Sequence, residues 1–148
     1  MAGNTVRLHR VFTAKPEKVF RAFVDADALA RWLPPNGFTA HVDEFDARVG
    51  GRFRMSFTNF STGSKTAFGG EFREVVAGQR LVYTDRFDDP ALPGEILVTI
   101  TFTAVSVGTE VHIVQENLPE MIPVEACYLG WQESLRFLAK IVEPEIPG

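Results

Sequence analysis

The sequence predicts an α+β fold, in which a curved antiparallel sheet of about seven strands wraps around one long C-terminal helix. A strand-like segment at the start is followed by two short helical patterns. Alternating apolar and polar residues, broken by turn residues, then fill positions 38–117, and one long helical pattern follows. A sheet with one apolar face must be covered, and only the last helix is long enough to cover it.

The first element is a strand. Residues 6–12 read VRLHRVF, and Val6, Leu8 and Phe12 fall on one face of a period-2 pattern. The next residues, TAKPE, offer Thr13 as a possible helix N-cap, followed by a proline that a first helical turn tolerates. A helix is therefore expected to begin here.

Two short helices are expected before residue 38. Apolar residues recur at helical spacing in two groups, and Asp25 and Asp27 lie where the first helix can end and the second can begin. The run PPNG at 34–37 stops the second helix. The two apolar groups are Val19, Phe20, Phe23 and Val24, and then Leu29, Trp32 and Leu33.

Between residues 38 and 117, runs rich in β-forming residues alternate with turn residues, the pattern of an antiparallel meander. At Gly50-Gly51 strand-like residues lie on both sides. We therefore expect a tight turn there rather than a phosphate-binding loop, which needs a helix N-terminus or a nest of free amides. The expected strands are 38–48, 51–59, 66–76, 80–88, 95–105 and 109–117.

The last element is an amphipathic helix over 124–142 that ends before Pro144. Its apolar residues are three and four positions apart. Gly130 lies within it, where the missing side chain lets the helix approach another element or leaves room for a ligand. No linker interrupts the pattern, so one domain over residues 1–148 is expected. The apolar positions are Val124, Tyr128, Trp131, Leu135, Leu138 and Val142.

Several short motifs extend over almost the whole chain. They are Phe12-Thr13-Ala14, Pro16-Glu17-Lys18-Val19-Phe20 with Phe23, Arg31-Trp32-Leu33, DARVGGRF at 46–53, GEFREV at 70–75, RLVYT at 80–84, and Gly130-Trp131 with Leu135 and Leu138. With the order of elements, they resemble the helix-grip fold of the START-like (SRPBCC) superfamily, in its heat-shock protein 90 ATPase activator-like branch. The resemblance implies a cavity under the long helix, which this superfamily uses for activities from lipid carriage to hormone binding and cyclisation.

The composition of the chain indicates which classes of partner and which compartment to expect. The net charge of −4 and pI near 5.4 give no positive field for nucleic acid or an anionic membrane. Cys127 is the only cysteine, so no intramolecular disulfide forms, which fits a reducing compartment. No apolar run is long enough for a signal peptide or a membrane span. We expect a soluble cytoplasmic protein, either monomer or homodimer.

Recognisable catalytic and metal-binding motifs are absent from the sequence. His9, His41 and His112 lie on three different expected strands without the spacing of a metal site. Cys127 is expected to be a buried, inert thiol. No catalytic residue, metal or cofactor is therefore expected, and a binding protein is favoured over an enzyme.

Strand alternation and the helix seam predict which side chains line the cavity. Gln115 is a candidate hydrogen-bonding residue there, although an amide at a strand end is often simply near water. Asp85 is a candidate buried carboxyl with a raised pKa, but a salt bridge to a neighbouring arginine is the interpretation that the sequence favours. The full set of candidates is Phe53, Met55, Phe57, Tyr83, Asp85, Phe87, Val98, Ile100, Ile113, Gln115, Tyr128, Trp131 and Leu135.

Three functions remain open from the sequence. The first is a binding domain that holds a small hydrophobic or amphipathic molecule between sheet and C-terminal helix. The second is a cyclase, dehydratase or hydrolase, which needs a perturbed Asp85, Glu71 or His41 facing the cavity. The third is a stress-related protein that interacts with a chaperone.

Overall fold

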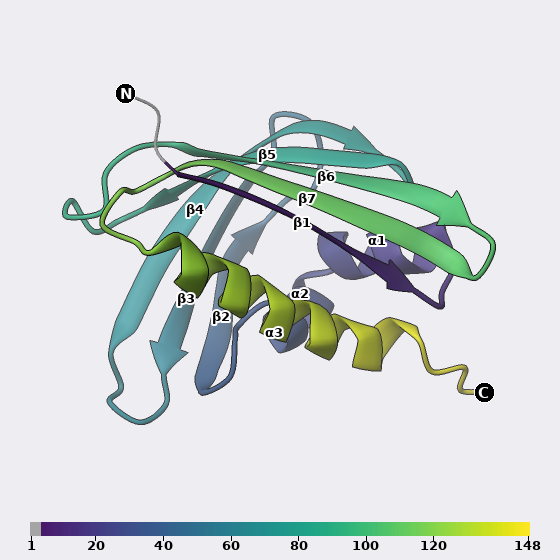
Figure 1. Ribbon diagram of the computed structural model, residues 1–148. Coiled ribbons are helices and arrows are strands. Elements are labelled where there is room, and N and C mark those ends of the chain that lie inside the picture. The colour runs from purple at the N-terminus through teal and green to yellow at the C-terminus, as the bar shows by residue number, and fades with distance from the viewer. Residues whose placement is uncertain (1–3) are drawn as a thin grey trace.

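The computed structural model describes residues 4–148, and residues 1–3 of the expected domain lie outside this range (Figure 1). Its elements follow the predicted order of one strand, two short helices, six strands and one long helix. They are β1 Asn4–Phe12, α1 Pro16–Val24, α2 Ala26–Trp32, β2 Phe38–Phe45, β3 Arg52–Asn59, β4 Lys65–Val76, β5 Arg80–Phe87, β6 Ile96–Val105, β7 Gly108–Leu118 and α3 Val124–Val142.

All seven strands form one antiparallel sheet in the order β1-β7-β6-β5-β4-β3-β2. Six strands form a meander, and β1 joins it beside β7. The sheet curves over α3, and α1 and α2 lie near one end of its concave side (Figure 1). This arrangement confirms the predicted α+β helix-grip fold.

The long helix α3 covers the concave face unevenly. The helix contacts β1, α1 and α2, and its buried residues begin at its middle: Trp131, Ser134, Leu135, Leu138, Ala139 and Val142. Residues 124–130 are exposed or only partly buried. The N-terminal part of α3 therefore leaves space between itself and the sheet. No helix among residues 4–148 combines the length and apolarity needed to cross a membrane.

The start of α1 differs from the sequence prediction. Lys15, not Thr13, is the N-cap residue, and its backbone is extended at φ −66° and ψ 152°. The reason is Pro16, since a proline forces the preceding residue out of the helical region. At the start of α2, the Asp25 side chain accepts a hydrogen bond from the Ala28 backbone N–H at 2.9 Å. Asp25 therefore restarts the helix as predicted.

The Gly50-Gly51 pair does not form the expected tight turn by itself. β2 ends at Phe45, earlier than predicted, and residues 46–51 form a loop before β3. The loop bonds to β4: Gly50 donates to the Phe72 carbonyl, and the Phe72 N–H donates to Gly51, both at 2.9 Å. Of the two glycines, only Gly50 has a positive φ, of 83°. Glycine is required at position 51 for a different reason, because a Cβ there would overlap the carbonyl oxygen of Asp46.

Replacing Gly51 by alanine is expected to lower the free energy of unfolding by about 2–3 kcal/mol, because the new methyl group forces the backbone of the loop to move. Urea denaturation measures this change. Gly63→Ala is the matched control: φ is +77° there, but a Cβ meets nothing within 4 Å. It should cost about 1 kcal/mol, the price of a left-handed residue alone. Equal losses in both variants would contradict the role of close packing at Gly51.

Candidate functional site

A cavity of about 250 Å³ lies between the concave face of the sheet and the N-terminal part of α3. Strands β3, β4, β5 and β7 form one wall, and α3 with the preceding loop forms the other. Leu33, the C-cap residue of α2, and Pro35 close one side. The lining residues are Leu33, Pro35, Phe57, Thr66, Phe68, Tyr83, Asp85, Phe87, Gln115, Leu118, Ile122, Ala126, Cys127, Gly130, Trp131 and Ser134.

Small side chains on α3 create much of this space. Ala126, Gly130 and Ser134 are four residues apart, so they lie in one row along the helix. A Cβ built at Gly130 meets nothing within 4 Å. The Ser134 hydroxyl lies 2.6 Å from the carbonyl oxygen of Leu33, which ties α3 to the end of α2. The helix is thus held in place while its small residues leave room beneath it.

Trp131 is fixed as part of the cavity wall. Its indole Nε1 donates a hydrogen bond to the Gln115 Oε1 at 3.0 Å. Gln115 therefore lies in the cavity lining, where the sequence suggested it as a hydrogen-bonding candidate, and its carbonyl oxygen already has a donor. This bond links α3 to β7 and sets the orientation of the indole ring.

Asp85 is the carboxylic acid in the cavity lining. It shares the concave face of β5 with Tyr83 and Phe87. The residue is only partly buried as a whole, but its Oδ1 is enclosed and has no hydrogen-bond partner. Burial raises the pKa of the Asp85 carboxyl to about 7, against a smaller opposing effect of the Arg86 backbone N–H. Burial and the nearby Asp85 charge also raise the pKa of Tyr83.

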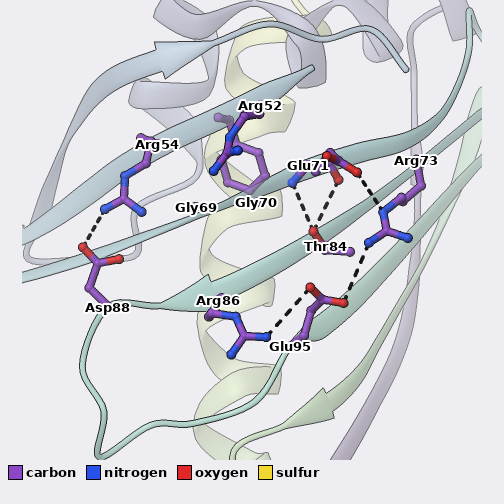
Figure 2. A pocket seen from close by; sticks show the side chains of 11 residues that line it. Arg52, Arg54, Gly69, Gly70, Glu71, Arg73, Thr84, Arg86, Asp88 and Glu95 are labelled. Atoms are coloured by element: carbon purple, nitrogen blue, oxygen red, sulfur yellow. Dashed lines mark hydrogen bonds and ion pairs between the residues drawn. The ribbon is translucent and has the colours of Figure 1, made fainter. Parts of the chain in front are cut away.

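The salt bridge that the sequence favoured for Asp85 is not formed within residues 4–148. The neighbouring arginines line a hollow of about 290 Å³ on the convex face of the sheet, opposite the cavity (Figure 2). Outward-facing residues of β3, β4 and β5 form its walls. There they pair with other acids: Arg54 with Asp88 at 2.5 Å, Arg73 with Glu71 at 3.3 Å, and Arg86 with Glu95 at 3.9 Å. Strand alternation separates Asp85 from these cations, because residues 84, 86 and 88 point the other way.

The strand pairing is irregular beside Asp85. A Cβ at Gly70 would overlap the carbonyl oxygen of Thr84, so only glycine allows β4 to approach β5 this closely. The Thr84 hydroxyl accepts a hydrogen bond from the Glu71 N–H at 3.1 Å, and the register of the two strands shifts between Phe72 and Glu74. Sequence reasoning missed this feature, although Gly69-Gly70 within an expected strand was a visible indication of it.

A second cavity, of about 40 Å³, lies deeper in the fold. Phe23, Trp32 and Phe72 are among its walls, and Tyr83 and Asp85 line both cavities. Asp85 therefore lies between the larger cavity and the densely packed aromatic core.

The structure brings together about half of the residues predicted to line the cavity. Five of the predicted residues line neither cavity, and one of these is Tyr128. The Tyr128 hydroxyl lies at β1, where it accepts a hydrogen bond from the Arg7 N–H at 3.1 Å. Of the predicted residues, those that line the larger cavity are Phe57, Tyr83, Asp85, Phe87, Gln115 and Trp131. Phe53 and Met55 line only the smaller cavity. The residues that lie in the buried core and line neither cavity are Val98, Ile100, Ile113 and Leu135.

Cys127 differs from the expected buried thiol. It is partly exposed and lines the larger cavity. Its desolvation raises the pKa of the thiol, which keeps the group protonated and unreactive at neutral pH.

The histidines lie away from the cavity. His9 and His112 are opposite each other on β1 and β7, with stacked rings 5.2 Å apart, and His41 pairs with Asp43 at 3.2 Å. Within residues 4–148, no three His, Cys, Asp or Glu side chains are grouped so that they could hold a metal ion.

Comparison with known proteins agrees with this architecture. A protein from Chromobacterium violaceum, solved by crystallography, is 57% identical, with 96% of this chain and 99% of that chain covered and a TM-score of 0.95. A crystal structure from Rhodobacter sphaeroides is 25% identical, with 94% and 93% covered and a TM-score of 0.84. No curated protein matches. The family model described as Activator of Hsp90 ATPase homolog 1-like protein matches residues 13–143. The resemblance seen in the sequence is thereby confirmed, and the chain belongs to the family of Activator of Hsp90 ATPase homolog 1-like proteins.

Proposed function

We propose that this protein binds a small, largely apolar molecule in the cavity between the sheet and the N-terminal part of α3. The observation that carries the proposal is the space under Gly130, walled by aromatic side chains and open to a ligand. Ligand sites are concave, mostly apolar, and contain a few well-placed polar groups. The volume of about 250 Å³ lies below the roughly 300–1,000 Å³ typical of drug-sized ligands, so the ligand is small.

The proposal predicts that filling the cavity from α3 weakens binding. Gly130→Phe places a ring in the open space and is expected to weaken binding of small aromatic probes at least about tenfold. The probes are a panel of monocyclic aromatic compounds, and Trp131 fluorescence and amide chemical shifts report their binding. Trp131 suits this purpose because it lines the cavity.

Leu129→Phe is the matched control. It adds a ring at the adjacent position of α3, where the side chain is 58% exposed and does not line the cavity. This variant should bind the probes as the wild type does. If Gly130→Phe also binds them with unchanged affinity, or if no probe binds to the wild type, the cavity is not a binding site and the proposal fails.

An enzyme remains the second candidate, and Asp85 is the observation that favours it. A carboxyl with a pKa near 7 in a cavity has the properties of a general acid or base. The other two acid/base candidates lie elsewhere: Glu71 lines the outer hollow and pairs with Arg73, and His41 is exposed beside Asp43. Among the described residues, the cavity lining adds no histidine, lysine or second carboxyl to Asp85, so we place binding ahead of catalysis. The chaperone-interacting alternative stays a prediction.

A further inference from the structure

One oxygen of the Asp85 carboxylate lacks a hydrogen-bond partner. Its Oδ1 is the only buried side-chain nitrogen or oxygen without a hydrogen bond in the part of the chain that the structure describes. An enclosed acceptor without a donor is unfavourable, and native proteins rarely retain one without a reason. Asp85 lines the proposed ligand cavity, but solvent does not reach its Oδ1, so the side chain must turn for a ligand to provide the missing donor.

The cavity walls favour a positively charged donor. Five of the lining residues are aromatic, and the faces of such rings attract ammonium groups. Among residues 4–148 no lysine or arginine lines the cavity, so a cationic ligand meets no competing charge there and an anionic one meets no counterion. The five aromatic residues are Phe57, Phe68, Tyr83, Phe87 and Trp131.

Gln115, Ser134 and Thr66 carry the uncharged polar side chains of the lining, and these are weaker acceptors for an ammonium group than a carboxylate is. The Gln115 Oε1 accepts from the Trp131 indole, and the Ser134 hydroxyl donates to backbone carbonyls. Tyr83 on β5 and Cys127 on α3 are the other titratable groups in the two linings. Burial raises the pKa of both, so both are neutral near pH 8. Asp85 is then the one lining group that can carry charge at that pH.

We propose that the molecule bound in this cavity is a small amine with an apolar body, whose protonated nitrogen donates a hydrogen bond to the Asp85 Oδ1. This inference rests on the proposed binding function and adds the chemical class of the ligand. A hydrogen bond between two charged groups is roughly twice as strong as a neutral one, which separates an amine from an alcohol of the same size. The aromatic walls hold the apolar body.

Calorimetric titration at pH 8 with four probes that share a phenylalkyl body tests the proposal. The probes are 2-phenylethylamine, 2-phenylethanol, propylbenzene and 3-phenylpropanoate. The amine is expected to bind about tenfold or more tightly than the alcohol, and the carboxylate most weakly. Asp85→Asn should reduce the preference for the amine over propylbenzene at least about tenfold. The preference should also shrink at pH 5.5, where Asp85 becomes protonated.

Asp88→Asn is the matched control, since it removes an acid three residues away on the outer face, where Asp88 pairs with Arg54. It should keep the wild-type preference for the amine. If propylbenzene binds but the amine binds no better than the alcohol, or Asp85→Asn keeps the amine preference, the amine proposal is overturned and the binding function stands. If none of the four probes binds, the binding function itself fails and the amine proposal fails with it.

Discussion

Trp32→Ala is expected to lower the free energy of unfolding by about 4 kcal/mol, within the 3–5 kcal/mol found when buried aromatic side chains are truncated. The Trp32 side chain is 0% exposed. Its Nε1 donates a hydrogen bond to the Ala22 carbonyl at 2.8 Å, and its ring packs edge-to-face on Phe23 with centroids 4.7 Å apart. Truncation leaves a large void and an unpaired buried carbonyl. Urea denaturation at 25 °C should show the loss as a lower midpoint with an unchanged slope.

Two further variants separate the loss of the Trp32 ring from the loss of its hydrogen bond. Trp32→Phe keeps a ring against Phe23 but removes the donor to Ala22, so it should cost about 1–3 kcal/mol. Phe60→Ala removes an aromatic ring that is 80% exposed and should change stability by less than about 0.5 kcal/mol. A Trp32→Ala variant that stays within 1 kcal/mol of the wild type would show that α2 is not held to the fold through this side chain.

Most of the fold could be predicted because each element carries its own periodic pattern. Residues 124–142 form α3 as their spacing predicted, and Asp25 separates two helices that are adjacent in sequence. The failures occur where tertiary contacts determine local structure. β2 ends at Phe45 because the loop after it bonds to β4 through Phe72. No pattern within residues 46–51 contains that information.

The candidate site was harder to predict than the fold. Strand alternation correctly placed Tyr83, Asp85 and Phe87 on one face of β5. Strand alternation predicts which face of the sheet a side chain is on. It does not predict at which positions along the strand the helix packs on that face and at which it leaves a cavity. Ile100 and Ile113 share the concave face with the cavity residues and yet lie in the packed core.

The spacing of α3 from the sheet depends on small residues. The apolar seam of the helix does not include Ala126 and Ser134, so the sequence analysis did not consider them. Their positions, four residues before and after Gly130, were visible in the sequence.

The pH dependence of stability provides the second large effect, and its sign follows from Asp85. The pKa of this carboxyl is about 7 in the folded state and near 3.8 when unfolded. Well below pH 3.8 both states are protonated, and Asp85 costs nothing. As the pH rises, the unfolded chain ionises first, so stability is lost progressively up to about pH 7 and then levels off. A shift of about three pKa units corresponds to roughly 4 kcal/mol, reduced to about 2–3 kcal/mol because Asp85 is partly exposed.

Asp85→Asn should therefore abolish a loss of about 2 kcal/mol between pH 5 and pH 8, measured by urea denaturation of both proteins at each pH. Asparagine brings its own packing and hydrogen-bond changes, but these do not vary with pH, so the slope isolates the carboxyl. Asp88→Asn is the control: Arg54 lowers the pKa of Asp88, which stays ionised across this range and contributes no slope. If wild type and Asp85→Asn show parallel pH profiles, Asp85 is ionised in the folded protein at pH 5. Its Oδ1 must then have a donor already, and the enclosed acceptor offered to a ligand does not exist.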